Sequence, residues 1–123
     1  MKKRTGSILP KRGDVWVVCF DPTVGSEIRK TRPAVILQND VANRYGAVTI
    51  VAAISSHTGD DVYPTEVLVN PPEGGLEKRS VVLLNQIRTI DKVRLVNRIG
   101  KLGSITMKAV DRAVLISMGL TNV

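Results

Sequence analysis

The sequence predicts a mostly-β domain, a small barrel of short strands with one C-terminal amphipathic helix. Two observations lead to this class. Six short apolar segments are separated by turn residues, and helical spacing of apolar residues is clear only near the end of the chain. The 123 residues suffice for one domain with a buried core. Because aromatic residues make up only 3%, this core must consist mainly of Val, Ile, Leu and Ala.

The first predicted strand, residues 15–20, is rich in β-forming residues and ends at Asp21-Pro22. A Pro- and Gly-rich turn occupies residues 71–75, and a short helical turn is expected at residues 91–94. Six short strands separated by turns are typical of a small barrel. The five strands after the first are predicted over residues 33–37, 47–54, 65–69, 80–84 and 95–99.

The last segment has the residue pattern of an amphipathic helix. Ser104 has the side chain of a good N-cap, and Asp111 and Arg112 fall on the polar side. We expect this helix to close the barrel or to pack against a partner subunit. Its apolar positions are Ile105, Met107, Val110, Val114 and Ser117 or Met118.

The chain is predicted to be a basic extension, residues 1–10, followed by a single domain over residues 11–123. The polar start, which ends in Lys11-Arg12, is either a segment without fixed structure or a flexible arm that contacts phosphates. No apolar stretch of signal-peptide or membrane-span type is present, so we expect a cytoplasmic protein without a membrane partner. The single Cys19 lies in an apolar run and is predicted to be a core residue.

The formal net charge of +7 favours a polyanionic partner, with nucleic acid ahead of a membrane surface. Proteins that hold single strands by base stacking usually display several aromatic rings. This chain has only Trp16, Phe20, Tyr45 and Tyr63, so recognition by stacking is disfavoured.

Residues 25–33 form the most conspicuous polar segment, because they join two apolar strands yet carry three cations and one acid. Pro33 restricts the preceding Arg32 to an extended conformation at the start of the next strand. A guanidinium held in this way suits bidentate contact with a phosphate, whereas the alternative is a solvated charge cluster. The charged residues are Glu27, Arg29, Lys30 and Arg32.

Two further polar segments follow apolar strands. Ser55 and Ser56 either cap a turn or donate hydrogen bonds to a phosphate, and the adjacent His57 is an exposed loop residue or a catalyst. After residue 84 the chain alternates polar and apolar residues, which places Gln86 and Arg88 on one face. Amide and guanidinium groups read base edges and phosphates, although a half-exposed edge strand gives the same pattern.

The sequence lacks the residues that other kinds of catalytic or metal site require. There is no Cys/His cluster for zinc and no glycine-rich phosphate loop, and a nucleophilic triad would have to use the single His57. The sequence therefore predicts no metal site and no cofactor. Catalysis, if present, depends on Arg, Glu and hydroxyl groups.

In these segments the chain resembles the MazF/PemK family of toxins from type II toxin–antitoxin systems. The resemblance covers about residues 11–120 and rests on several short motifs in a fixed order. These motifs lie at residues 12–16, 21–27, 30–35, 38–40 and 86–91.

The resemblance implies an SH3-like β-barrel of the MazF, Kid and CcdB type with a C-terminal helix, which forms a homodimer. It implies a ribosome-independent, metal-independent endoribonuclease, or mRNA interferase, that cuts single-stranded RNA at short sequences. Without a metal, the 2′-OH would attack the neighbouring phosphate and leave 2′,3′-cyclic phosphate and 5′-OH ends. An acidic or amphipathic antitoxin segment would block the RNA groove.

By its position in these motifs, Arg32 matches the family's catalytic arginine. Ser55 matches a catalytic Thr or Ser, and Glu27 matches an acid that some members use. Ser55 replaces the more common Thr, so Ser56 could compete for its role. Either Glu27 or Arg32 is the general base, and Glu27 is the better candidate because arginine stays protonated. The residues expected to contact RNA are Arg29, Lys30, Thr31, Ser56, Gln86 and Arg88.

Two alternatives belong to other functional classes. A barrel of the same architecture could poison DNA gyrase by protein contact, although such a binder needs neither the Gly-Ser-Glu motif nor the Arg-Pro motif. A non-catalytic RNA-binding module is compatible with the charge and disfavoured by the few aromatic residues.

Overall fold

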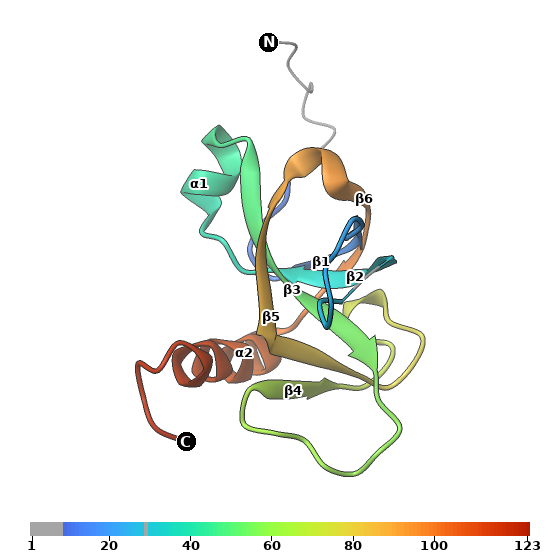
Figure 1. Cartoon of the computed structure of the whole chain (residues 1–123), viewed down its shortest axis with the longest axis vertical. Coiled ribbons are helices and arrows are strands. Elements are labelled where there is room, and N and C mark those ends of the chain that lie inside the picture. The colour runs from blue at the N-terminus through green and yellow to red at the C-terminus, as the bar shows by residue number, and fades with distance from the viewer. Residues whose placement is uncertain (1–8, 29) are drawn as a thin grey trace.

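The computed structural model describes residues 9–28 and 30–123 (Figure 1). Each predicted strand is present, with ends shifted by at most two residues except at the end of β5. In chain order, the elements are β1 Asp14–Cys19, β2 Thr31–Ile36, α1 Asp40–Tyr45, β3 Val48–Ser56, β4 Glu66–Val69, η1 Glu73–Gly75, β5 Ser80–Asp91, η2 Lys92–Arg94, β6 Leu95–Lys101 and α2 Ser104–Ser117.

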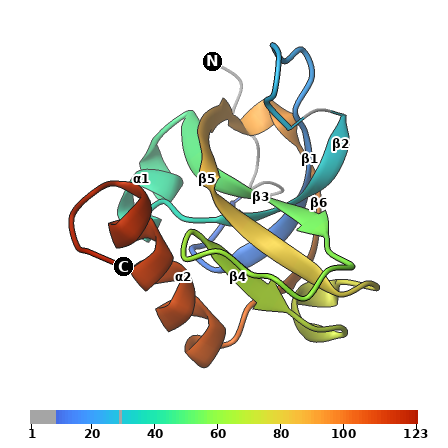
Figure 2. The same cartoon turned by 60° about the horizontal axis from the view of Figure 1, so that its bottom comes forward.

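The six strands form one antiparallel sheet in the order β4-β5-β3-β2-β1-β6. The sheet is strongly coiled, with α2 across one end, as Figure 2 shows. Within the described residues the edge strands β4 and β6 do not pair with each other, so the predicted barrel is barrel-like without a closed ladder. Instead η1, which follows β4, packs directly on β6.

Both faces of the central strands are buried, because alternate residues of a strand point to opposite sides. The helix-side core lies under α2 and contains Val15, Val35, Ala52, Ile54, Val67, Val69, Leu76, Val82, Leu84, Leu102, Val110 and Ala113. The loop-side core fills the other face and contains Trp16, Val18, Phe20, Ala34, Ile36, Val51, Ala53, Ile90 and Leu95. As predicted, aliphatic residues make up most of both cores.

β5 is longer than predicted because it continues through the segment that the sequence suggested could be an edge strand. Ala52 of β3 pairs with Ile87 of β5, and Ile54 pairs with Val82. An advance of two residues along β3 therefore corresponds to five residues along β5. This irregularity bends β5 sharply, and bulges are a common cause of such bends. The first half of β5 therefore lies between β4 and β3, whereas its second half pairs with β3 alone.

The helix α2 confirms the predicted amphipathic segment with two corrections. Its N-cap is Gly103, with no side-chain cap, and Ser104 is the first helical residue. Ile105 is 84% exposed, because it lies two residues from Met107 and therefore on the opposite side of the helix. Val110 and Ala113 carry the buried face.

The sequence did not predict α1, whose six residues are too few to show helical periodicity. Its signal is the N-cap residue Asn39, whose Oδ1 accepts a hydrogen bond from the Ala42 N–H at 2.8 Å. Cys19, predicted to be a core residue, is only half-buried.

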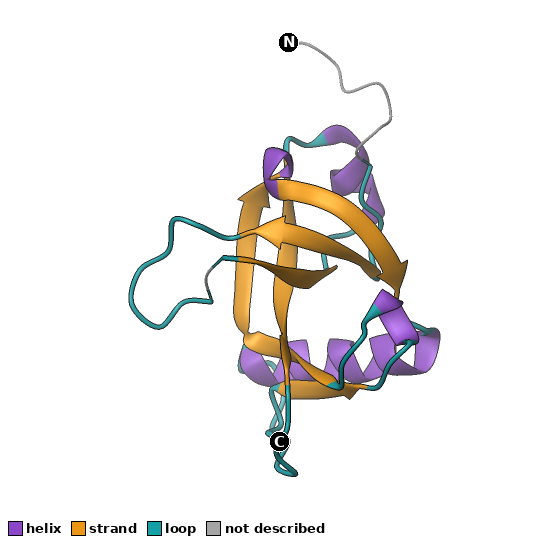
Figure 3. Cartoon of the chain, turned by 90° about the vertical axis from the view of Figure 1, so that its right-hand side faces the viewer, coloured by secondary structure: helices purple, strands orange, loops and turns teal. Residues whose placement is uncertain are grey.

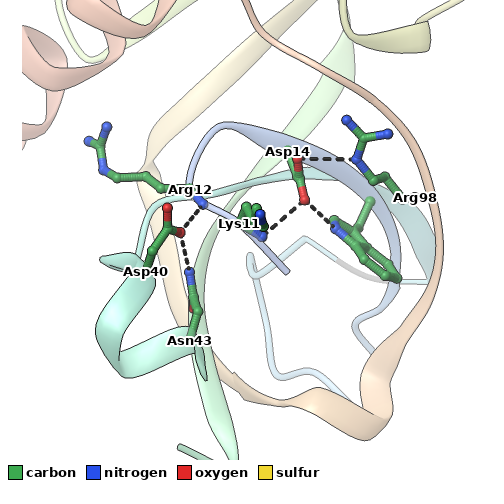
Figure 4. Close-up of polar contacts among 7 residues, drawn as sticks. Lys11, Arg12, Asp14, Asp40, Asn43 and Arg98 are labelled. Atoms are coloured by element: carbon green, nitrogen blue, oxygen red, sulfur yellow. Dashed lines mark hydrogen bonds and ion pairs between the residues drawn. The ribbon is translucent and has the colours of Figure 1, made fainter. Parts of the chain in front are cut away.

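Arg12, at the start of the predicted domain, contacts residues from distant parts of the chain. The Arg12 N–H donates to Asp40 Oδ1 at 2.7 Å (Figure 4). The Arg12 Nε donates to the Leu37 carbonyl, and the guanidinium forms an ion pair with Asp111. Nearby, Asp14 accepts the Lys11 N–H and pairs with Arg98. Residues 1–8, which contain most of the predicted extension, lie outside the described residues.

No helix in the described part of the chain is long and apolar enough to cross a membrane.

The close approach of η1 to β6 gives a stability prediction. A Cβ on Gly100 would lie 2.5 Å from the Gly74 carbonyl carbon, so Gly100→Ala must displace backbone and should destabilise the fold by about 3 kcal/mol. Gly59→Ala is the control, since the nearest atom to its Cβ is His57 Cε1 at 3.9 Å. Urea unfolding midpoints measure the difference, and equal midpoints for the two variants would contradict this packing.

Candidate active site

Arg32 and Ser55 come together through the register of β2 against β3. The paired residues are Ala34↔Ala53, Val35↔Ala52 and Ile36↔Val51. Continuing this register by two residues places Arg32 opposite Ser55, and strand alternation turns both side chains to the face of the loop-side core. The recorded pairing between β2 and β3 begins at Ala34, next to Pro33, which has no N–H to donate.

Gln86 and Arg88 project from β5 on the same face, because they alternate with Ile90 of the loop-side core. Both side chains hold the connection between β1 and β2. Gln86 Oε1 accepts the Ile28 N–H at 3.2 Å and its Nε2 donates to the Ser26 carbonyl at 3.4 Å. Arg88 Nη1 donates to the Phe20 carbonyl at 2.8 Å, and its guanidinium lies 5.9 Å from the centroid of the Phe20 ring.

The β1–β2 loop projects from the sheet (Figure 3). It contains a tight turn, in which the Glu27 N–H donates to the Val24 carbonyl at 3.2 Å. The Glu27 carboxylate accepts the Val24 N–H at 2.6 Å, and Gly25 adopts a φ of 58°. The exposed Glu27 carboxylate is thereby held in one orientation by its own turn.

A cleft of about 340 Å³ lies between this loop and β5. Glu27 lines it together with the amide of Gln86 and the guanidinium of Arg88, whereas Arg32 and Ser55 are not among its lining residues. Glu27, the predicted acid, therefore lines the same cleft as Gln86 and Arg88, which are predicted to contact RNA. Its walls are Phe20, Ser26, Glu27, Ile28, Asn85, Gln86, Ile87 and Arg88.

The other predicted residues lie around this arrangement. Lys30 and Thr31 are exposed next to Arg32, whereas Arg29 lies outside the described residues. Ser56 points to the opposite face from Ser55 by strand alternation and pairs with Ser80 at the end of β3. The structure thus favours Ser55 over Ser56 as the hydroxyl beside Arg32.

His57 is half-buried, in contrast to the exposed loop residue that the sequence suggested, and its buried Nε2 has no hydrogen-bond partner among the described residues. Sequence reasoning also missed Arg79, whose Nη1 donates to the carbonyls of His57 and Gly59. No local signal could have identified this contact, because Arg79 lies about 20 residues from its partners.

Across the described residues, no three His, Cys, Asp or Glu side chains are grouped closely enough to hold a metal ion. The charged groups of the site are instead the cations Lys30, Arg32 and Arg88 with the acid Glu27. This excess of positive charge suits an anionic substrate.

Comparison with known proteins identifies the family of the chain. Residues 11–118 match the family described as PemK-like, MazF-like toxin of type II toxin–antitoxin system. The chain is 43% identical over 113 residues to the endoribonuclease EndoA of Bacillus subtilis, covering 92% of this chain and 97% of that protein.

Solved structures with the same fold share less sequence. MazF from Deinococcus radiodurans has a TM-score of 0.77 at 22% identity and covers 90% of this chain and 97% of its own. A mycobacterial endoribonuclease, solved in complex with its cognate antitoxin, has a TM-score of 0.75 at 22% identity and covers 93% and 99%.

Gln86→Ala tests how the loop is held. Removing the amide deletes the acceptor of the Ile28 N–H, so this amide proton should exchange with solvent about 2–10-fold faster. Hydrogen exchange followed by NMR measures the change, with the amide of Val35 in β2 as an internal reference. Unchanged protection at Ile28 would show that Gln86 does not hold the loop.

Proposed function

The chain belongs to the PemK-like, MazF-like toxin family of type II toxin–antitoxin systems, and on this premise we propose that it is an endoribonuclease that cuts single-stranded RNA at short specific sequences. The 43% identity to a protein named as an endoribonuclease supports this activity. The observation that carries the proposal is the register of β2 against β3. Continued by two residues, this register sets Arg32 opposite Ser55, on the face that also carries Gln86 and Arg88.

The proposed reaction needs no metal ion. The 2′-OH of one nucleotide attacks the adjacent phosphorus, the bond to the 5′-oxygen of the next nucleotide breaks, and 2′,3′-cyclic phosphate and 5′-OH ends form. This step requires a base for the 2′-OH proton, stabilisation of the phosphorane charge and a proton for the leaving oxygen.

Three side chains divide these tasks in the proposal. Arg32 stabilises the phosphorane with its permanent positive charge and also donates the proton to the leaving oxygen. The Ser55 hydroxyl donates a hydrogen bond to a phosphoryl oxygen. Glu27 acts as the base, and its turn already orients the carboxylate.

Substrate contacts come from the surrounding polar residues in this proposal. Lys30 and Thr31 join Arg29 in binding the RNA backbone, while Gln86 and Arg88 line the groove. Ser56, also predicted to contact RNA, points to the other face of β3 and has no role in this proposal. Because Gln86 and Arg88 also hold the loop, their removal would affect both substrate contacts and loop position.

The partners follow from the same family membership. We propose that the chain acts in the cytoplasm as a homodimer and that a cognate antitoxin inhibits it through an acidic or amphipathic segment. The excess of positive charge, +7 over the whole chain, supports binding of both RNA and an acidic segment.

Arg32→Ala should lower the rate of RNA cleavage by about 10²–10³-fold, because it removes the main charge on the phosphorane. Purified protein is incubated with a long single-stranded RNA in EDTA, and the ends of the fragments are mapped. Arg112→Ala, on the exposed side of α2, loses the same charge and should cleave at the wild-type rate. Cleavage by Arg32→Ala at the wild-type rate, or trapping of DNA gyrase without RNA cleavage, would contradict the proposal.

The two neighbouring serines give a second prediction. Because the β2–β3 register, continued past Ala34, places Ser55 and not Ser56 on the face of Arg32, Ser55→Ala should lose more cleavage activity than Ser56→Ala, by about tenfold or more. Rates are compared on the same RNA under single-turnover conditions. Equal losses would mean that the two hydroxyls share the role, and a larger loss for Ser56→Ala would reverse the assignment.

A further inference from the structure

Two arginines hold three consecutive carbonyl groups where β1 enters the loop. Arg94 Nη1 donates to the Cys19 carbonyl at 3.0 Å and also to the Asp21 carbonyl. Between them, the Phe20 carbonyl accepts from Arg88. Backbone carbonyls outside a ladder need such donors, so these side chains complete the hydrogen bonding at the root of the loop.

Arg94 donates hydrogen bonds to the segment just after the point where the pairing of β1 with β6 ends. The last recorded pair is Val18↔Leu95, and Arg94 immediately precedes Leu95 in η2. Its half-buried side chain supplies the donors that a longer β6 would have supplied from its backbone. Within the described residues, the contacts of the Arg94 guanidinium are with backbone carbonyls, so its charge faces carbonyl dipoles rather than a carboxylate.

η2 is itself fixed, which makes Arg94 a rigid support. Asp91 Oδ1 accepts the Val93 N–H at 2.9 Å and caps η2. The Lys92 N–H donates to the Ala47 carbonyl at 3.0 Å, and Lys92 Nζ donates to the Asn43 carbonyl. The guanidinium is therefore anchored to the β3 side of the molecule.

A second set of contacts joins the root of the loop to the start of β2. Asp21 Oδ1 accepts the Lys30 N–H at 3.0 Å, and the Phe20 N–H donates to the Lys30 carbonyl at 2.9 Å. Lys30 has a φ of 68°, a left-handed conformation that a non-glycine residue adopts only when its surroundings impose it. Since Lys30 lies two residues before Arg32, these contacts set the direction in which the catalytic strand begins.

We propose that Arg94 is a positioning residue for RNA cleavage, acting through the Cys19–Asp21 carbonyls and Lys30 to hold Arg32 and the loop in their reactive arrangement. This inference rests on the proposed endoribonuclease activity. Arg94 is a cleaner test of positioning than Arg88, because Arg88 also lines the cleft.

Arg94→Ala should lower kcat by about 100-fold with KM within about threefold of wild type, because the reacting groups are misplaced while the RNA contacts remain. Arg94→Lys should give an intermediate kcat, since a single nitrogen makes both bonds and an ammonium also carries several donors. Arg44→Ala is the matched control: Arg44 is exposed on α1, its loss changes the charge equally, and wild-type kinetics are expected.

Two further measurements separate this inference from the proposed function. Hydrogen exchange at the Lys30 amide should accelerate in Arg94→Ala without any RNA present. Asp21→Ala, at an exposed position, removes the acceptor of the Lys30 N–H and should also lower kcat. In the double variant of Arg94→Ala and Asp21→Ala, the two losses should not add. If Arg94→Ala fails to fold, Arg94→Lys and Asp21→Ala decide the question.

The inference is overturned if Arg94→Ala keeps the wild-type kcat, or if its loss lies entirely in KM. It is also overturned if exchange at Lys30 is unchanged in a folded Arg94→Ala. Absence of RNA cleavage by the wild-type protein contradicts the proposed function instead, and the exchange experiment then still tests whether Arg94 holds Lys30.

Discussion

The register of β2 against β3 is the constraint on which the candidate site depends. Alternate residues of these strands fill two different cores, so a slip of one residue would move both buried sets to the wrong faces. The same slip would turn Arg32 away from the face that carries Gln86 and Arg88. Packing on both faces thus fixes the fold and also the side of the sheet to which Arg32 and Ser55 both point. Small side chains at Ala34 and Ala53 lie next to this pair.

The loop that carries Glu27 is held differently from the strands. Its contacts to the body of the domain are made largely by side chains, from Gln86, Arg88 and Arg94, rather than by a ladder. Hydrogen bonds of this kind contribute about 1 kcal/mol each, or somewhat more when the donor is charged. A segment supported in this way opens at lower free energy than the core strands. Such a loop can be ordered in one arrangement and still open more readily than the sheet.

The aromatic residues explain how a strand of RNA would be recognised here. Trp16 and Phe20 are buried in the loop-side core, whereas the exposed Tyr45 and Tyr63 lie outside the cleft beside the loop. The cleft presents amide, carboxylate and guanidinium groups instead of open ring faces. Under the proposed function, recognition at this cleft would depend on hydrogen bonds. Those to base edges carry sequence information that stacking does not, whereas those to phosphates position the strand.

The sequence by itself determined the strands and the amphipathic helix, because apolar runs and helical spacing are local properties. The restriction that Pro33 imposes on Arg32 is local as well. The order of short motifs along the chain likewise indicated the family. Tertiary structure alone decided that Ser55 rather than Ser56 faces Arg32, that β5 bends and continues past residue 84, and that Gln86 holds the loop. Each of these depends on which strands pair and in which register, and pairing joins residues too distant in sequence for any local pattern to specify.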